Sequence, residues 1–598
     1  MRRFRHFSWL GAGLLTAQLW GAEPPGSPTP TPPPGATVAT PTGVSDWNEL
    51  KKRIAQQEEQ IKRLQQAVDE QRSLLEKAVA ATNASTNSAN ANGATASNEV
   101  NTVAVANKAG DGSVPIVPAV NVAHPRWALS RAGQKLPSGE PTAISPLGIK
   151  IGSSTFTPLG FVDFTWFGRS TNVGSGLGTN FAGIPYNTST TAHLSENNFS
   201  AQNSRIGFRV DSTVLGAKIL GYFEADFYGN QGGNVFVSNG AATFRMRNVF
   251  IDAQKGKWEI LGGQDWSMFT PNRKGLSPIP ADIFYTQNMD LNYQAGLVWA
   301  RQSQFRLVFH PNKDWALGLS LENPQQYVGG SGGLNGAAVA FPTGLAATLI
   351  PQFNNVATNV TVTTGNTTTT VAGDQNYATP NLHPDIIFKG AYDAHMGAKD
   401  KILHFEAGVL TRSFKDTLPA AGRYQSNTAT VVSGTVNANL EIVKNVRLIA
   451  NTFFGEGGGR YIFGLAPDLI VRSNGTIAPI HSYSTVDGIE AQVNKNTLLY
   501  GYYGGVYIGR QTAIDTTVTP RRLIGYGYPG SGPNDNRTIQ EATLGVIQTL
   551  WKSSSYGALS IITQYSYLTR NPWSVNLINT PKSTHSNLYY IDLRYTLP

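Results

Sequence analysis

The segment from Gln202 to Tyr228 constrains the fold most, because polar and apolar residues alternate along two runs that are separated by a short turn. In the first run, Ile206 and Phe208 lie between charged neighbours. Successive side chains of a β-strand point to opposite faces, so both runs predict strands with one apolar and one charged face. The charged positions are Arg205, Arg209, Lys218, Glu224 and Asp226. The apolar face would meet a second sheet in a soluble sandwich, or lipid in a membrane barrel with a charged lumen.

The same alternation recurs from Thr157 to the C-terminus and predicts sixteen strands. They span residues 157–167, 202–212, 217–228, 242–253, 257–264, 296–310, 315–322, 384–394, 401–413, 429–443, 445–455, 483–493, 497–509, 538–551, 556–568 and 586–597. Short turns alternate with long loops, among them 265–295, 323–383 and 414–428. This segregation is typical of bacterial outer-membrane barrels and is not expected of a large soluble β-protein. We therefore predict an all-β fold over residues 151–598, a 16-stranded antiparallel transmembrane β-barrel whose two ends lie on the short-turn, periplasmic side.

The N-terminus has the pattern of a secretory signal peptide over residues 1–22. Basic residues precede a short apolar run, which ends at the small residues Gly21-Ala22. The Pro/Thr-rich segment 23–44 predicts an extended spacer, and the low-complexity segment 79–150 predicts a linker. A secreted chain with a barrel pattern is expected in the bacterial outer membrane.

Between the spacer and the linker, residues 45–78 carry a heptad pattern that predicts an N-terminal α-helical coiled coil in the periplasm. The seam contains Leu50, Ile54, Gln57, Ile61, Leu64, Val68, Gln71 and Leu75. The alternative is a single amphipathic helix that packs on its own domain. We prefer oligomerisation, because the apolar stripe is only as wide as a coiled-coil seam and low-complexity segments flank it.

Composition narrows the possible functions. The chain of 598 residues contains no cysteine, which excludes disulfides, thiolate metal sites and cysteine nucleophiles. The formal net charge is +9, but lysine and arginine are spread thinly along the chain, so nucleic acid is not an expected partner. The nine histidines show no HExxH spacing, and no GKS or GKT phosphate loop occurs. We therefore expect no enzymatic activity, no cofactor and no metal site.

The charges on the polar strand faces would set the selectivity of a lumen. Basic residues on these faces are Arg205, Arg209, Lys218, Arg245, Arg247 and Arg306, and the acidic residues Glu224, Asp226, Glu322 and Glu406 share the wall. An excess of arginine favours anions, and the guanidinium fork fits carboxylate or phosphate. Alternatively, these residues pair across strands and only stabilise the wall. A single arginine fits either interpretation, whereas the group favours a basic face near the narrowest part of the pore.

The loop 265–295 follows the fifth predicted strand. In sixteen-stranded porins, the loop at this position folds inward and narrows the pore. By this analogy, we expect Arg273 and Lys274 at the constriction, with Asp265 and Asp282 as counter-charges. The loop also contains the aromatic residues Trp266, Phe269, Phe284 and Tyr285. We expect most of them to pack the loop against the wall.

The sequence contains the motifs SRIGFRV, GYFEADF, FRMRNVFID, GGQDWSMF and LENP, in addition to the signal peptide and the heptad helix. Together these features resemble the DcaP-like family of trimeric outer-membrane porins. Phosphate-selective porins share a similar pattern in the second and third strands. The resemblance implies a trimer of 16-stranded barrels with a trimeric coiled coil, and uptake of small anions such as dicarboxylates through an Arg-lined constriction. It places the basic strand motifs of the family at Arg205, Arg209, Arg245 and Arg247.

We therefore expect an outer-membrane porin for passive diffusion of small, preferentially anionic solutes that resemble dicarboxylates or phosphate. Its expected partners are further copies of the chain in a homotrimer, outer-membrane lipid and lipopolysaccharide, and the small anionic solutes. The alternative function is structural. In that case the protein ties the outer membrane to the periplasmic layer through its N-terminal coiled coil.

Overall fold

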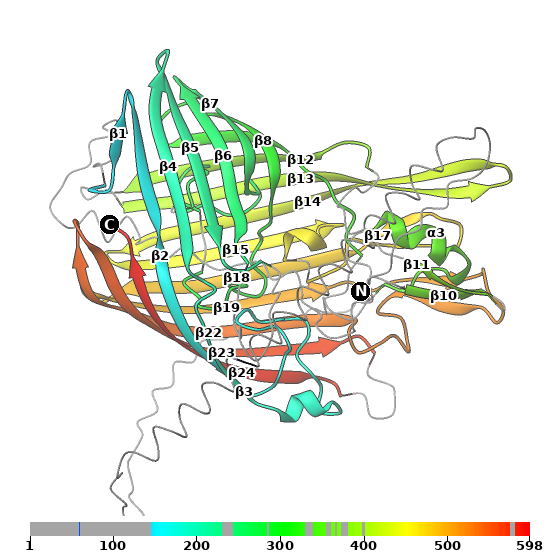
Figure 1. The fold of residues 1–598 in the computed structure, drawn as a ribbon. Helices are drawn as coiled ribbons and strands as arrows, with labels where there is room; N and C mark the ends of the chain where they lie inside the picture. Colours follow the sequence, from blue (N-terminus) through cyan, green and yellow to red (C-terminus); the bar gives the residue numbers. More distant parts are fainter. Residues whose placement is uncertain are drawn as a thin grey trace, which may run out of the picture. The chain divides into compact units, whose positions relative to one another are not determined.

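The computed structural model describes Glu59 and most of the chain from Ser145 onward (Figure 1). The described ranges are 145–229, 243–280, 282–283, 286–328, 339–353, 360–364, 367–371, 381–396, 401–463, 465–574 and 581–598. The described residues from Ser145 onward belong to one compact unit. The predicted signal peptide, the spacer, the coiled coil with all eight named seam residues, and most of the linker lie outside the described residues.

The sheet forms a closed antiparallel barrel, because each wall strand pairs with the next and the last strand, β24, pairs with β2. The wall strands are β2 (Ser154–Arg169), β4 (Arg205–Val214), β5 (Ala217–Asp226), β6 (Arg245–Lys255), β7 (Trp258–Trp266), β8 (Arg301–Phe309), β9 (Trp315–Glu322), β12 (Asp385–Met396), β13 (Lys401–Ala420), β14 (Arg423–Val443), β15 (Val446–Glu456), β18 (His481–Gln492), β19 (Thr497–Ile508), β22 (Asn536–Ser553), β23 (Gly557–Pro572) and β24 (Thr584–Thr596). Figure 1 shows β2 in cyan beside β24 in red. The predicted 16-stranded barrel is confirmed.

Two further short strands belong to this sheet, which explains why it holds 18 strands in all (18 − 2 = 16 wall strands). β3 (Glu196–Ser200) pairs with the C-terminal part of β2, and β4 pairs with its N-terminal part. Together, β3 and β4 therefore fill one position in the wall. β1 (Ile149–Ile151) pairs with the N-terminal end of β2, on the same edge of β2 that pairs with β24 farther along the strand. The Ser145 hydroxyl donates to the carbonyl of Pro598 at 3.0 Å, so the two ends of the barrel meet at the same rim.

The remaining elements lie in the long loops. They are β10 (Val360–Thr364), β11 (Thr367–Val371), β16 (Leu469–Val471), β17 (Ile477–Pro479), β20 (Gln511–Asp515), β21 (Arg522–Tyr526), the short helix α3 (Ala346–Leu349) and the 3-10 turns η2 (Thr190–His193), η3 (Thr343–Leu345), η4 (Ile350–Gln352) and η5 (Gly459–Tyr461). Among the described residues, no helix is long and apolar enough to cross a membrane. The prediction of a loop at 414–428 is wrong. β13 and β14 continue as a paired ribbon to a tight turn at Ala421-Gly422, because β13 keeps burying alternate side chains, among them Phe414 and Leu418.

Alternation along the strands gives the wall two faces. Outward-facing apolar residues are exposed, as at Val162 and Ile206, whereas the polar residues next to them, Asp163 and Arg205, are buried inside the barrel. The predicted sidedness of the opening hairpin is therefore confirmed. This pattern matches a wall with lipid on one side and a polar interior on the other.

Gly263 on β7 offers a test of how tightly the wall is packed near the end of this strand. Its φ is +142°, and an added Cβ would lie 2.6 Å from Phe250 Cα on β6, whereas an added Cβ on the adjacent Gly262 would meet nothing within 4 Å. We expect Gly263→Ala to destabilise the barrel by about 2 kcal/mol or more, and Gly262→Ala to have little effect. Heat-modifiable mobility of the refolded protein in detergent measures the folded fraction, and equal losses in both variants would contradict this prediction.

Candidate pore interior

The segment between β7 and β8, residues 267–300, lies inside the barrel. Several of its described backbone N–H groups donate hydrogen bonds to side chains of strands around the wall. These bonds replace the backbone partners that an irregular segment lacks. These bonds run from Met268 to Glu322 (2.9 Å), Asn272 to Glu406 (3.0 Å), Gln287 to Tyr502 (3.1 Å), Ala295 to Glu541 (2.8 Å) and Val298 to Asn451 (3.0 Å). We call this segment the inward loop. Its position agrees with the expectation from the sequence.

The inward loop is fixed partly by aromatic packing. Trp266, Phe269, Tyr293 and Trp299 are at most 1% exposed. The ring of Trp299 packs on those of Trp266 and Tyr293, with centroid distances of 5.3 and 4.6 Å. This agrees with the packing role expected for Trp266 and Phe269. Phe284 and Tyr285 lie outside the described residues.

Four arginines and two carboxylates form a charged group on β4, β5, β6 and β8, which we call the arginine cluster. Its members are Arg205, Arg245, Arg247, Arg301, Glu224 and Asp226. Glu224 pairs with Arg205 at 3.3 Å and with Arg247, and Asp226 pairs with Arg245 at 2.7 Å and with Arg247 at 3.1 Å. The cluster has a formal charge of +2 (4 − 2). Carboxylates therefore organise the arginines without cancelling their charge.

A β-bulge brings two of these arginines to the interior. The register of β5 and β6 shifts between Glu224 and Ala225, so that Arg247 has no opposite residue. Strict alternation from the outward-facing Ile251 would otherwise place Arg247 and Arg245 on the lipid side. The extra residue in a bulge turns side chains to the other face. Arg247 is consequently 1% exposed and Met246 lies outside.

Arg301 was not among the residues predicted from the sequence. It starts β8 on the same alternation phase as the lipid-facing Phe305, so its pattern gives no signal for an interior position. Its guanidinium lies 5.2 Å from the centroid of the Trp266 ring, over which Arg247 also lies at 5.7 Å. Arg301 Nη1 and Arg205 Nη2 are buried and have no hydrogen-bond partner among the described residues. The hydrogen-bonding capacity of these two nitrogen atoms is thus unsatisfied within the part of the chain that the structure describes.

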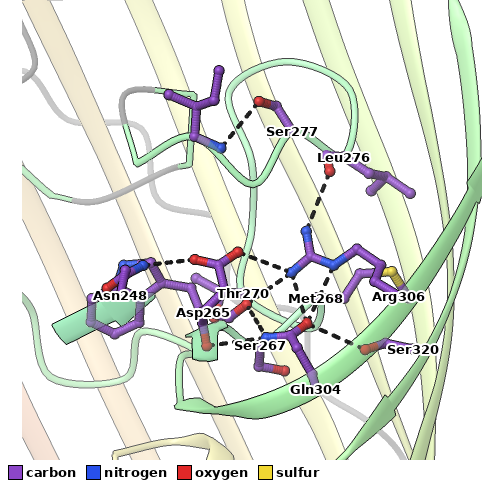
Figure 2. A network of polar contacts seen from close by, with 12 residues as sticks. Asn248, Asp265, Ser267, Met268, Thr270, Leu276, Ser277, Gln304, Arg306 and Ser320 are labelled. Carbon is purple, nitrogen blue, oxygen red and sulfur yellow. Dashed lines mark hydrogen bonds and ion pairs between the residues drawn. The ribbon is translucent and has the colours of Figure 1, made fainter. Parts of the chain in front are cut away.

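Arg306 on β8 lies in a separate network beside the root of the inward loop (Figure 2). It pairs with Asp265 at 3.4 Å, and its Nη2 atom donates to the carbonyl of Trp266 at 2.9 Å and to Gln304 at 2.9 Å. Asn248 donates to the same carboxylate of Asp265 at 2.7 Å. Asp265 is therefore the partner of Arg306, and it differs from its expected role as a counter-charge for Arg273 and Lys274.

Arg273 extends from the inward loop to the far wall. Its guanidinium makes two bonds to Glu490 on β18, at 2.8 and 2.9 Å, and Tyr502 on β19 donates to Glu490 at 2.6 Å. Lys274 is exposed, and it has no ion pair with the described residues. Asp282 accepts a hydrogen bond from Ser277 at 2.9 Å, within the loop itself. The two predicted basic residues of the loop thus differ, since Arg273 is bound to the wall and Lys274 is exposed.

Two predicted residues lie apart from the arginine cluster. Arg209 is half-buried and pairs with Asp211 on its own strand, Nε to Oδ2 at 2.7 Å. Lys218 is exposed next to the short turn between β4 and β5, and it lies opposite Thr213 and Gln254. Both side chains belong to the part of the wall between the arginine cluster and the short turn that joins β4 and β5.

The second half of the wall contributes basic residues that the sequence analysis did not single out. Lys389 pairs with Glu406 at 2.8 Å, Arg412 with Asp385 and Asp468 at 3.0 Å each, and Arg594 with Asp163 at 2.6 Å. Inward alternation would have flagged Lys389, Arg412 and Arg594 as candidates. Their partners come from other strands and loops, so pairing was not visible in the sequence.

Comparison with solved structures identifies the fold. The outer membrane channel DcaP of Acinetobacter baumannii covers 75% of this chain and 99% of its own, with 14% sequence identity and a TM-score of 0.52. The chain has the fold of a DcaP-like outer-membrane porin. OmpT of Vibrio cholerae covers 75% of the chain and 99% of its own at 12% identity, and an anion-selective porin from Comamonas acidovorans covers 74% and 100% at 11% identity, both with a TM-score of 0.37. No protein-family model and no curated protein matches the sequence.

The porin fold accounts for the layout of the charged interior. A closed wall with a polar inner face, an inward loop and exposed apolar outer residues is the architecture of a channel. It also fits a place in the outer membrane. The expectation of a porin is confirmed at the level of the fold.

Proposed function

We propose that this protein is an outer-membrane porin for passive diffusion of small solutes, with a preference for anions such as dicarboxylates or phosphate. The arginine cluster is the observation that supports the proposal most strongly. Its formal charge is +2 (4 − 2), and the Arg205 Nη2 and Arg301 Nη1 atoms lack acceptors among the described residues. The Arg245 side chain of the cluster is 21% exposed, so a permeating carboxylate or phosphate reaches the cluster there, in the geometry that guanidinium groups bind.

The inward loop adds to this preference. It carries the exposed Lys274 next to Arg273, while the carboxylates nearest to the loop are held by partners, as with Asp265 and Arg306. Charged side chains that are paired along the wall bind an ion weakly at several positions. The ion can therefore move from one position to the next without being trapped. The solute gradient then drives transport.

The reversal potential of the purified protein tests this proposal. In a planar bilayer with a potassium chloride gradient, we expect the sign that corresponds to chloride permeating faster than potassium. Phthalate or succinate on one side should reduce chloride current more than a neutral solute of the same size does. A cation-selective reversal potential would overturn the anion preference, and an absence of channels would overturn the porin function.

We also propose that the chain forms a homotrimer through the coiled coil at 45–78. A charged residue in the seam must lose its hydration, which costs several kcal/mol. We therefore expect Ile54→Asp with Ile61→Asp to abolish the trimer in chemical cross-linking of the full-length protein. Gln56→Asp with Arg63→Asp has the same spacing outside the seam and should leave the trimer intact. A trimer that survives the seam substitutions would show that the barrels alone hold it together.

A further inference from the structure

Two arginines and a tryptophan form a group on the outer surface of the barrel, at the long-loop end of β19, β22 and β23. Arg510 follows the end of β19, Arg537 lies near the start of β22, and Trp573 follows the end of β23. The guanidinium carbons of Arg510 and Arg537 lie 4.6 and 5.9 Å from the centroid of the Trp573 ring. We call this group the arginine–tryptophan patch. Trp573 also packs against the main buried cluster, whereas the two guanidinium groups take part in none of the charged networks described above.

The patch faces outward because its ring packs on an outward-facing residue. Tyr507 on β19 is 40% exposed, and its ring meets that of Trp573 edge-on at 6.1 Å. Arg537 sits at a register shift between β22 and β23, where a bulge interrupts the pairing of Asn536 and Thr538. Both arginines are exposed. The patch is therefore accessible from outside the wall, and solutes in the lumen do not reach it.

The tryptophan ring is held in place by the surrounding loops. Its Nε1 atom donates to the carbonyl of Ile508 at 3.0 Å, and its backbone N–H donates to the carbonyl of Asp535 at 2.8 Å. Gly527 lies directly against the ring, since an added Cβ there would come within 2.6 Å of Trp573 Cδ1. The ring is thus a fixed platform that orients both guanidinium groups.

The two arginines have no counter-charge among the described residues. Neither forms an ion pair or a hydrogen bond there, whereas interior arginines such as Arg247 and Arg594 each pair with carboxylates. Two like charges against one ring repel each other, and the ring compensates only part of their charge. Anionic groups bound to them would accept hydrogen bonds from their N–H groups and reduce the repulsion.

The surroundings indicate which anion this is. Toward the short-turn rim, the same outer face carries a band of exposed apolar and aromatic side chains, namely Tyr503, Tyr507, Leu544, Tyr565 and Tyr567. Tyrosines of this kind mark the boundary between hydrocarbon and headgroups in membrane barrels. Arginine just beyond such a band is at the depth of lipid phosphates.

We propose that Arg510, Arg537 and Trp573 form a binding site for the phosphate group of an anionic lipid in the outer leaflet. The two guanidinium groups bind the phosphate oxygens, and the acyl chains lie along the tyrosine band below. The site rests on the outer-membrane location proposed above, but it does not depend on the selectivity of the channel.

Native mass spectrometry of the purified full-length protein tests the site, with diphosphoryl lipid A as the probe and its dephosphorylated form as the comparison. We expect Arg510→Gln with Arg537→Gln to weaken binding of the diphosphoryl form about tenfold or more, since each charged hydrogen bond contributes to affinity. Arg423→Gln with Arg521→Gln removes the same charge from other exposed loop positions and should bind like the unaltered protein. Inorganic phosphate at the same concentration should not displace the lipid.

Three results would overturn the proposal. They are equal binding by the double variant and the unaltered protein, equal binding of the dephosphorylated lipid, and displacement by inorganic phosphate, which would indicate a site for a free anion. The first of these results, if the oligomer is also lost, would assign the patch to a subunit contact. Conductance and reversal potential of the double variant should match those of the unaltered protein, so failure of the lipid site and failure of the porin function are distinguishable.

Discussion

Arg301→Glu is expected to shift the channel from anion preference toward cation preference. The substitution changes the formal charge of the arginine cluster from +2 to 0 (3 − 3), because one arginine is replaced by a third carboxylate. One unit charge about 7 Å from a permeating ion, at an effective dielectric constant of about 40, contributes about 1 kcal/mol, or roughly a fivefold change in permeability ratio. A reversal of charge doubles that energy. The reversal potential in a potassium chloride gradient measures the change.

Arg301 is suited to this test because it has no carboxylate partner among the described residues, so its removal leaves no acid unpaired. The same change at Arg247 would release both Glu224 and Asp226 inside the barrel. Arg301→Gln should give an intermediate reversal potential. Lys218→Gln is the control, since Lys218 is exposed near the short-turn rim and should leave selectivity unchanged. Unaltered selectivity in Arg301→Glu would show that ions pass without sensing the cluster.

The barrel was predictable from the sequence because the alternation of polar and apolar residues along a strand shows which residues share a face. Each residue such as Ile206 or Arg205 shows by alternation which side it occupies, and no distant partner is needed for that inference. Loop lengths add the direction of the strands. The predicted ends of two strands were wrong at 414–428. This polar segment resembles a loop in composition, but it continues the pairing of β13 and β14.

The candidate site was less predictable, because its contacts join distant parts of the chain. Arg273 and its partner Glu490 are 217 positions apart, and no local pattern links them. The entry of Arg301 into the interior breaks the alternation on which the sequence inference depends. Arg245 and Arg247 were placed correctly, because they alternate locally with the outward-facing Phe244 and Met246, but the bulge that follows them was not visible in the sequence. The exceptions to regular alternation thus occur at the arginine cluster, where irregular backbone directs charged side chains into the barrel.

Arg273→Gln is expected to loosen the inward loop and to increase single-channel conductance. The Arg273 guanidinium makes two bonds to Glu490, whose side chain is fully buried. Removal of one partner from a buried ion pair costs about 3 kcal/mol or more, because the remaining charge lacks compensation. Part of that cost falls on the loop, since Arg273 is next to Asn272, the residue that binds Glu406. We expect a larger and noisier conductance together with a lower melting temperature.

The double variant Arg273→Gln with Glu490→Gln separates the two consequences. It removes the uncompensated charge, so most of the lost stability should return, while the loop remains without its charged link to β18 and conductance stays high. Lys274→Gln removes the same charge from the adjacent, exposed position and should leave both conductance and melting temperature close to those of the unaltered protein. If Lys274→Gln raised conductance as much as Arg273→Gln does, the effect would come from local charge. The ion pair would then not be what holds the loop across the pore.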